Sequence, residues 1–165
     1  MNNCIKTYCD KNNEKQKPKL LEIIDFATRR ENLFHTRDIS QDKFDEFANK
    51  LLKRKNDIEQ AKNFHELITI VYNEKIPGIG HVNVYDVAEI IGESLELYPE
   101  MVYLHAGVET GAKKYFGNKY EEVIEKKDNF IVIRKKHFLP KFKKFTCDHL
   151  ESALCMTNGN LDIIL

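Results

Sequence analysis

The sequence has no apolar run near the ~20 residues that a helix needs to cross a bilayer. Its first residues, MNNCIKTYCDKNNEKQK, are polar and contain no apolar stretch like the centre of a secretory signal. We therefore expect a cytoplasmic protein without a membrane partner. Residues 1–17 are expected to form a mobile arm ahead of one domain at 18–165.

Closely spaced cysteine pairs are also missing. None of the four cysteines is in a Cys-x-x-Cys pair: Cys4, Cys9, Cys147 and Cys155. In a reducing compartment no disulfide framework is expected from them. A zinc site built from these cysteines with His149 would be poorly spaced. Thiols without a metal, some of them buried, are the favoured interpretation, and no cofactor is expected from this pattern.

The sequence lacks an excess of either charge, with 26 Lys and Arg against 26 Asp and Glu. Global charge therefore indicates no partner. The distribution is uneven, because segment 126–144 has eight Lys and Arg and only Asp128 as an acid. Such a segment favours contact with an anion. The candidate contacts within it are Lys135, Lys136, Lys141, Lys143 and Lys144.

Apolar residues make up 42% of the 165 residues, which suits one folded domain with a real core. Their spacing is mostly helical, and it predicts an all-α domain of five to seven helices. Phe130–Ile133 is the one plausible strand, and it is too short to form a sheet alone. Segment 102–112 is expected to be helical, either continuous or, as we prefer, broken at Gly107.

The most informative stretch is Ile76-Pro77-Gly78-Ile79-Gly80, which lies between two helical patterns at about 64–72 and 82–95. Pro77 ends the first helix. Gly78 and Gly80 permit backbone angles and close approaches that a Cβ would block. The second helix then begins with backbone N–H groups at its positive end, which suits an anion such as phosphate. In the plainer interpretation, the glycines only allow two helices to pack.

These residues, from about 64 to 91, resemble the helix-hairpin-helix motif, a sequence-independent binder of the DNA backbone in repair and replication proteins; we place the motif at 64–95. The resemblance implies that backbone amides hold DNA phosphates, here those of Gly78, Ile79, Gly80, His81, Val82 and Asn83. It also implies a monovalent cation on the carbonyl groups of Glu74, Ile76 and Ile79. The chain departs from the family after the glycines, where members that bind DNA often have Lys or Arg.

A wider resemblance is to the helix-hairpin-helix DNA glycosylases, in which a Val-Asp-Thr-His segment follows the hairpin. Here the segment is Val102-Tyr103-Leu104-His105, so Tyr103 replaces the catalytic Asp. The nucleophilic lysine of the bifunctional members is also missing. Residues from about 20 onward further resemble small bacterial proteins that have no assigned function, and this resemblance implies no activity.

Two residues are candidates for catalysis that would not use the family's own groups. Asp86 could act as a general base, although an acid near a helix N-terminus is also a routine partner of the helix dipole. His105 could orient a base or donate to a phosphate. Equally, it could be a packed histidine bonded to a carbonyl group, and it could pair with Glu109 on a continuous helix.

The basic segment also contains Phe138, Phe142 and Phe145 at helical spacing. We prefer the interpretation that these rings pack on the domain and leave a basic rim. Contact of the rings with nucleic acid, or a surface helix on a membrane interrupted by Pro140, are the alternatives.

Taken together, the sequence predicts a small protein that binds double-stranded DNA with little base preference. The first alternative is a protein–protein interaction module on the same helices. The second is a divergent glycosylase-like enzyme that uses Asp86 or His105, although we do not favour an enzyme.

Overall fold

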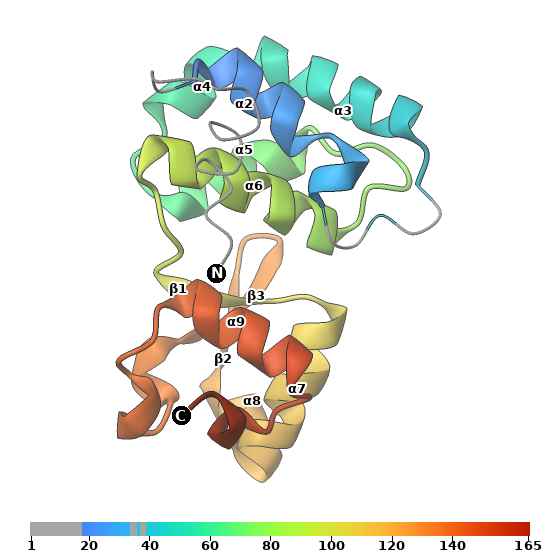
Figure 1. Cartoon of the computed structure of the whole chain (residues 1–165). Helices are drawn as coiled ribbons and strands as arrows, with labels where there is room; N and C mark the ends of the chain where they lie inside the picture. Colours follow the sequence, from blue (N-terminus) through green and yellow to red (C-terminus); the bar gives the residue numbers. More distant parts are fainter. Residues whose placement is uncertain (1–17, 34–35, 37–38) are drawn as a thin grey trace. The chain divides into compact units, whose positions relative to one another are not determined.

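The structure is a computed structural model that describes residues 18–33, 36 and 39–165 (Figure 1). The expected arm at 1–17, with Cys4 and Cys9, lies outside these residues. The chain divides into two compact units, where the sequence analysis assumed one domain; the first ends at Tyr98 and the second is Pro99–Leu165. Within the described ranges, no helix is long and apolar enough to cross a membrane.

The first unit is entirely helical in its described part. Its elements are α2 (Leu20–Ala27), a 3₁₀ turn (Arg30–Asn32), α3 (Gln41–Lys53), α4 (Lys55–Gln60), α5 (Phe64–Asn73) and α6 (His81–Leu95). Helix α6 packs against both α2 and α5, and α3 packs against α2. This arrangement places α6 in the centre of the unit.

The apolar stripes predicted on either side of the glycine turn are buried. They comprise Phe64, Leu67, Ile68 and Val71 of α5 and Val84, Val87, Ala88 and Ile91 of α6. Each fully buried Leu or Ile contributes about 1.5–3 kcal/mol relative to exposure. The Phe64 ring also meets the Tyr85 ring edge-on, with centroids 5.9 Å apart. The turn therefore connects two helices whose apolar faces are packed in the core.

The second unit combines helices with a small sheet. Its regular elements are β1 (Met101–Leu104), α7 (Ala106–Phe116), α8 (Tyr120–Val123), β2 (Ile124–Lys127), β3 (Phe130–Arg134) and α9 (Cys147–Met156). Short 3₁₀ turns lie at Gly117–Lys119, Lys135–His137, Pro140–Phe142 and Leu161–Ile164. The sheet is antiparallel with strand order β1-β3-β2, and Val132 lies opposite both Tyr103 and Glu125.

The predicted fold is therefore confirmed in part, since the protein is mostly helical but has a three-stranded sheet and is not all-α. The strand at Phe130–Arg134 is not isolated, because β1 and β2 pair with its two edges. Met101–Leu104 was expected to be helical, but all four of its residues are buried. Periodicity cannot distinguish a short strand that is buried throughout from a segment of buried helix.

The break that we preferred at Gly107 lies slightly earlier, because β1 ends at Leu104 and a new helix, α7, runs from Ala106 through both glycines to Phe116. The close approach that we expected from a continuous helix is present. A Cβ on Gly111 would lie 2.0 Å from the carbonyl oxygen of Leu154 in α9, and one on Gly107 would lie 2.8 Å from Cys155 Sγ. The small residues therefore let α7 and α9 pack closely.

The phenylalanines of the basic segment pack as we preferred, but not on one helix. Two 3₁₀ turns, the second starting at Pro140, replace the expected helical stripe. Phe138 and Phe142 are buried in the core of the second unit. The Phe138 ring stacks on Tyr115 with centroids 5.6 Å apart. The aromatic rings therefore serve packing, and the lysines between them remain at the surface.

Candidate functional site

The turn between α5 and α6, called here the α5–α6 hairpin, is closed by its own backbone. The Ile79 amide donates to the Ile76 carbonyl over 3.0 Å. Both isoleucine side chains are buried, and they fix the turn to the core. Gly78 has a φ of +100°, an angle that residues with a side chain rarely adopt. Glycine at position 78 is therefore a requirement of the backbone.

Helix α6 begins at the end of this turn. Gly80 is its N-cap, and the Gly80 amide donates to Asn83 Oδ1 over 3.3 Å. Amides in the first turn of a helix have no acceptor within the helix, and the dipole makes this end positive. Among the six amides predicted to hold phosphate, those of Ile79 and Gly80 are engaged inside the hairpin. The positive end of the helix dipole lies at the first turn of α6, His81–Asn83.

Position 80 differs from position 78, because its backbone angles do not require a glycine. The backbone of Gly80 is extended, with a φ of −87° that any residue can adopt. Among the described residues, a Cβ built on Gly80 would meet nothing nearer than Asn83 Oδ1, at 3.9 Å. The residue is exposed. The protein's own packing therefore does not require glycine at this position.

A lysine from another helix lies over the hairpin. Nζ of Lys43 in α3 is 2.6 Å from the position that a Cβ on Gly78 would take, and its Cδ is 3.3 Å from it. The residue is exposed, and no ion pair joins it to another described residue. The sequence analysis missed Lys43, because it precedes Gly78 by 35 positions. Only the packing of α3 brings it to the turn.

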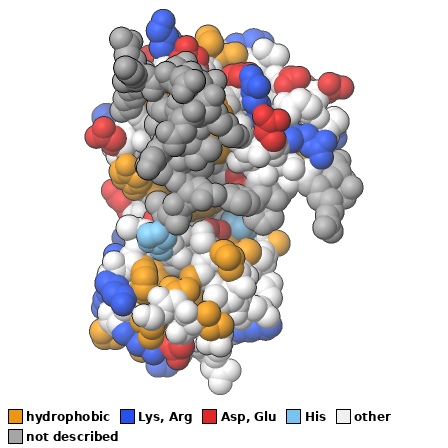
Figure 2. All heavy atoms as spheres, viewed as in Figure 1, with side chains coloured by type: hydrophobic (Ala, Val, Ile, Leu, Met, Phe, Trp, Pro, Cys, Tyr) orange, Lys and Arg blue, Asp and Glu red, His pale blue; other side chains and the backbone are white. Residues whose placement is uncertain are grey.

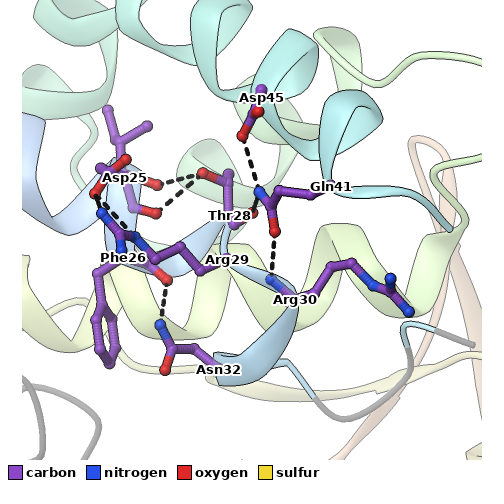
Figure 3. A network of polar contacts seen from close by, with 9 residues as sticks. Asp25, Phe26, Thr28, Arg29, Arg30, Asn32, Gln41 and Asp45 are labelled. Atoms are coloured by element: carbon purple, nitrogen blue, oxygen red, sulfur yellow. Dashed lines mark hydrogen bonds and ion pairs between the residues drawn. The ribbon is translucent and has the colours of Figure 1, made fainter.

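The start of α3 is fixed by Gln41, two residues before Lys43 (Figure 3). Gln41 Nε2 donates to the Thr28 carbonyl over 3.2 Å and to Asp45 Oδ1 over 2.8 Å. The Arg30 amide donates to Gln41 Oε1 over 3.1 Å. One side chain thus joins the first turn of α3 to the residues that follow α2, which limits where Lys43 can lie.

Other polar and aromatic groups surround the hairpin. Lys75 Nζ lies 4.1 Å from the centroid of the Tyr72 ring, and the Tyr72 and His81 rings meet edge-on at 5.0 Å. Arg54 forms ion pairs with Asp57 and Glu74. The arginine charge near the hairpin is therefore balanced by carboxylates.

The predicted lysines of the basic segment lie in the second unit, on the two 3₁₀ turns and the turn before α9. Lys136, Lys143 and Lys144 are exposed, and Lys135 is half-buried. Lys141 pairs with Asp162 at 2.5 Å. On the face drawn in Figure 2, charges of both signs are interspersed in the first unit, whereas most visible charged side chains of the second are positive.

The two catalytic candidates belong to different units. Asp86 is half-buried in the second turn of α6. His105 is the N-cap of α7 and is buried, with Nε2 2.6 Å from Oε1 of buried Glu151 in α9. Glu109, the partner expected for His105, instead pairs with Lys113 at 2.6 Å. No group of three or more metal-ligating side chains is present in the described part of the chain.

Glu151 was missed, although the sequence contained a signal for it. It falls on the stripe of Cys147, Leu150 and Leu154 that α9 turns toward the core. An acid on such a stripe requires a buried partner, since burial of an unpaired charge is costly. His105 supplies that partner and ties β1 to α9.

Burial also changes the acidity of groups in the second unit. It raises the pKa of the Cys147 thiol and that of the Tyr103 hydroxyl. It raises the pKa of Tyr120 to about 12, with a further contribution from the charge of Glu109. These shifts stabilise the neutral forms, which is the opposite of what a thiolate nucleophile requires at Cys147.

Comparisons with protein-family models, with curated proteins and with solved structures find no match for this chain. The hairpin resemblance therefore stays a prediction.

Proposed function

We propose that the protein binds the phosphate backbone of double-stranded DNA through the α5–α6 hairpin, with little base preference. The observation that carries the proposal is Gly80. It is exposed at the N-terminus of α6, and no packing against a described residue requires it to lack a side chain. A partner that approaches the backbone closely would require position 80 to lack a side chain.

The positive end of α6 supplies the attraction for a phosphate oxygen. Contacts of this kind fix a protein on the duplex but do not read its sequence. Neutralised phosphates release counterions, so affinity should fall steeply as salt rises. The exposed lysines of the basic segment would add affinity that is equally independent of sequence.

A monovalent cation at the hairpin belongs to the proposal. The candidate ligands are the carbonyl groups of Glu74, Ile76 and Ile79, which all belong to the turn or its borders. Carbonyl oxygens suit such an ion, and each has two lone pairs. The Ile76 oxygen already accepts the Ile79 amide, so it would use its second lone pair. An ion there would stiffen the turn.

The test is fluorescence anisotropy with a labelled duplex, a single strand and an abasic duplex, each at two salt concentrations. The first variant is Gly80→Ser, since serine is a favoured N-cap and position 80 has room for its Cβ. We expect a melting temperature that is not lowered and is at most slightly raised, and at least about tenfold weaker duplex binding, which is ~1.4 kcal/mol. Ala106→Ser, at the exposed first residue of α7, is the control and should bind as the wild type does.

Other results of the anisotropy experiment would contradict the proposal or favour one of the alternatives. Equal affinity at low and high salt, or equal binding by wild type and Gly80→Ser, would contradict the proposal. A protein that binds none of the three nucleic acids would point to the interaction-module alternative. Preference for the abasic duplex would favour the glycosylase-like alternative, for which release of a base should be lost in Asp86→Asn or His105→Gln.

A further inference from the structure

We infer that Lys43 of α3 is a phosphate-contacting residue of the same site and supplies the cationic side chain that residues 81–83 lack. The inference rests on the proposed function. Residues 81–83 after the glycines are His, Val and Asn, so the hairpin sequence contributes no lysine or arginine there. The structure places a lysine at the turn from a distant part of the chain.

The placement involves the whole far end of the side chain. Nζ, Cδ and Cε of Lys43 lie 2.6, 3.3 and 3.5 Å from the position of a Cβ on Gly78. The lysine thus follows the exposed face of Gly78 through space that any other residue would fill. Its ammonium group lies beside Gly78, which precedes the N-cap of α6 by two residues. Gly78 belongs to the turn that leads into the positive end of that helix.

The charge of Lys43 is also available to a ligand. No ion pair joins Lys43 to a described residue. Arg54, by contrast, is bound to Asp57 and Glu74, and Lys75 lies over the Tyr72 ring. An exposed ammonium group that pairs with no carboxylate of the described residues retains its attraction for an anion.

Hydrogen bonds at the start of α3 hold the backbone of Lys43 in a fixed position. Gln41 fixes the first turn of α3 through the Thr28 carbonyl and the Arg30 amide (Figure 3). Lys43 is in that same turn. Its backbone is therefore held in place, and only the rotation of its own side chain has to be restricted when a phosphate binds.

The experiment uses the full chain and titrates a labelled DNA duplex at four or more salt concentrations. Lys43→Gln should weaken binding about fivefold at low salt and reduce the slope of log affinity against log salt by about 0.9, the value for one phosphate contact. Lys43→Arg should retain binding, because it keeps the charge. The control is Lys53→Gln, an exposed lysine at the far end of α3, and it should leave the slope unchanged.

The outcomes separate this inference from the proposed function. If Lys43→Gln matches the wild type while Gly80→Ser loses binding, the inference is overturned and the hairpin proposal stands. Equal losses in Lys43→Gln and Lys53→Gln would mean that only total charge matters, which also overturns it. Should the wild type fail to bind the duplex in a salt-dependent way, the proposed function and the inference both fall.

Discussion

Two glycines separated by one residue have different reasons to be present in the hairpin. At Gly78 the backbone angle itself excludes most side chains. At Gly80 the angle is ordinary and the space is open. A glycine that the fold does not require lowers the stability of the native state slightly, because it adds freedom to the unfolded chain. Gly80 is therefore the position at which the proposed DNA contact, rather than the backbone angle, would require glycine.

At the residue scale, Tyr120 predicts how stability changes in alkali. Its pKa is raised from 10.0 to about 12 by burial and by Glu109, whose Oε1 accepts its hydroxyl at 3.4 Å. Between pH 10 and 12 the unfolded tyrosine therefore loses its proton while the folded one keeps it. Stability should fall with rising pH over this range, by up to about 1.4 kcal/mol per pH unit from this one group.

The measurement is urea unfolding of the wild type and of Tyr120→Phe at pH 9 and pH 11. The variant should lose less stability between the two pH values, since it has no hydroxyl to ionise. The exposed Tyr98→Phe serves as the control and should behave as the wild type does. Parallel losses in all three proteins would show that Tyr120 is not protected by burial.

At the scale of elements, the packing of α7 on α9 predicts a graded effect of adding methyl groups. An alanine at Gly111 would place its Cβ 2.0 Å from a backbone oxygen, which cannot move without shifting α9. An alanine at Gly107 would meet only the Cys155 side chain, at 2.8 Å. Gly111→Ala should therefore cost at least about 2 kcal/mol, and Gly107→Ala clearly less. Thermal and urea unfolding of both variants would check this order, and the reverse order would contradict it.

The same elements show what periodicity can and cannot predict. The stripes of α5 and α6 were readable because about half of each helix surface is buried, which leaves a 3.6-residue pattern. Strand β1 was not readable because all four residues are buried. Strand β2, with the sequence Ile-Glu-Lys-Lys, has little apolar content, and only pairing with β3 makes it a strand.

The candidate site also has a part that could be predicted from the sequence and a part that could not. The glycine turn is local, so the sequence revealed it. The position of Lys43 beside Gly78 and that of Glu151 beside His105 depend on helices that meet only in three dimensions. Glu151 at least broke an apolar stripe, whereas Lys43 is an ordinary exposed lysine in the first turn of its helix. Nothing in its neighbourhood along the chain distinguishes it.

At the scale of the whole molecule, the neutral net charge conceals a difference between the two units. Up to Tyr98 the chain has 15 Lys and Arg against 17 Asp and Glu, and from Pro99 it has 11 against 9. The unit that contains the hairpin is therefore slightly acidic. In the proposed complex, local cations rather than the overall field would attract a phosphate to it.

This balance predicts a contribution from the second unit to DNA affinity. The double variant Lys136→Gln/Lys143→Gln removes two exposed lysines of the basic segment and should weaken duplex binding at low salt by about threefold to tenfold. Lys114→Gln/Lys119→Gln makes the same change in net charge on exposed lysines of the same unit. Salt-dependent anisotropy distinguishes the two. If they weaken binding equally, the basic segment has no special role.

The lysine that lies over Gly78 has a consequence for how this protein can diverge. Positions 43 and 78 share one volume, although 35 residues separate them in the chain. A lineage that acquired a side chain at position 78 would have to shorten or redirect the one at 43. In an alignment of relatives the two columns should therefore covary, with long basic residues at 43 accompanying glycine at 78.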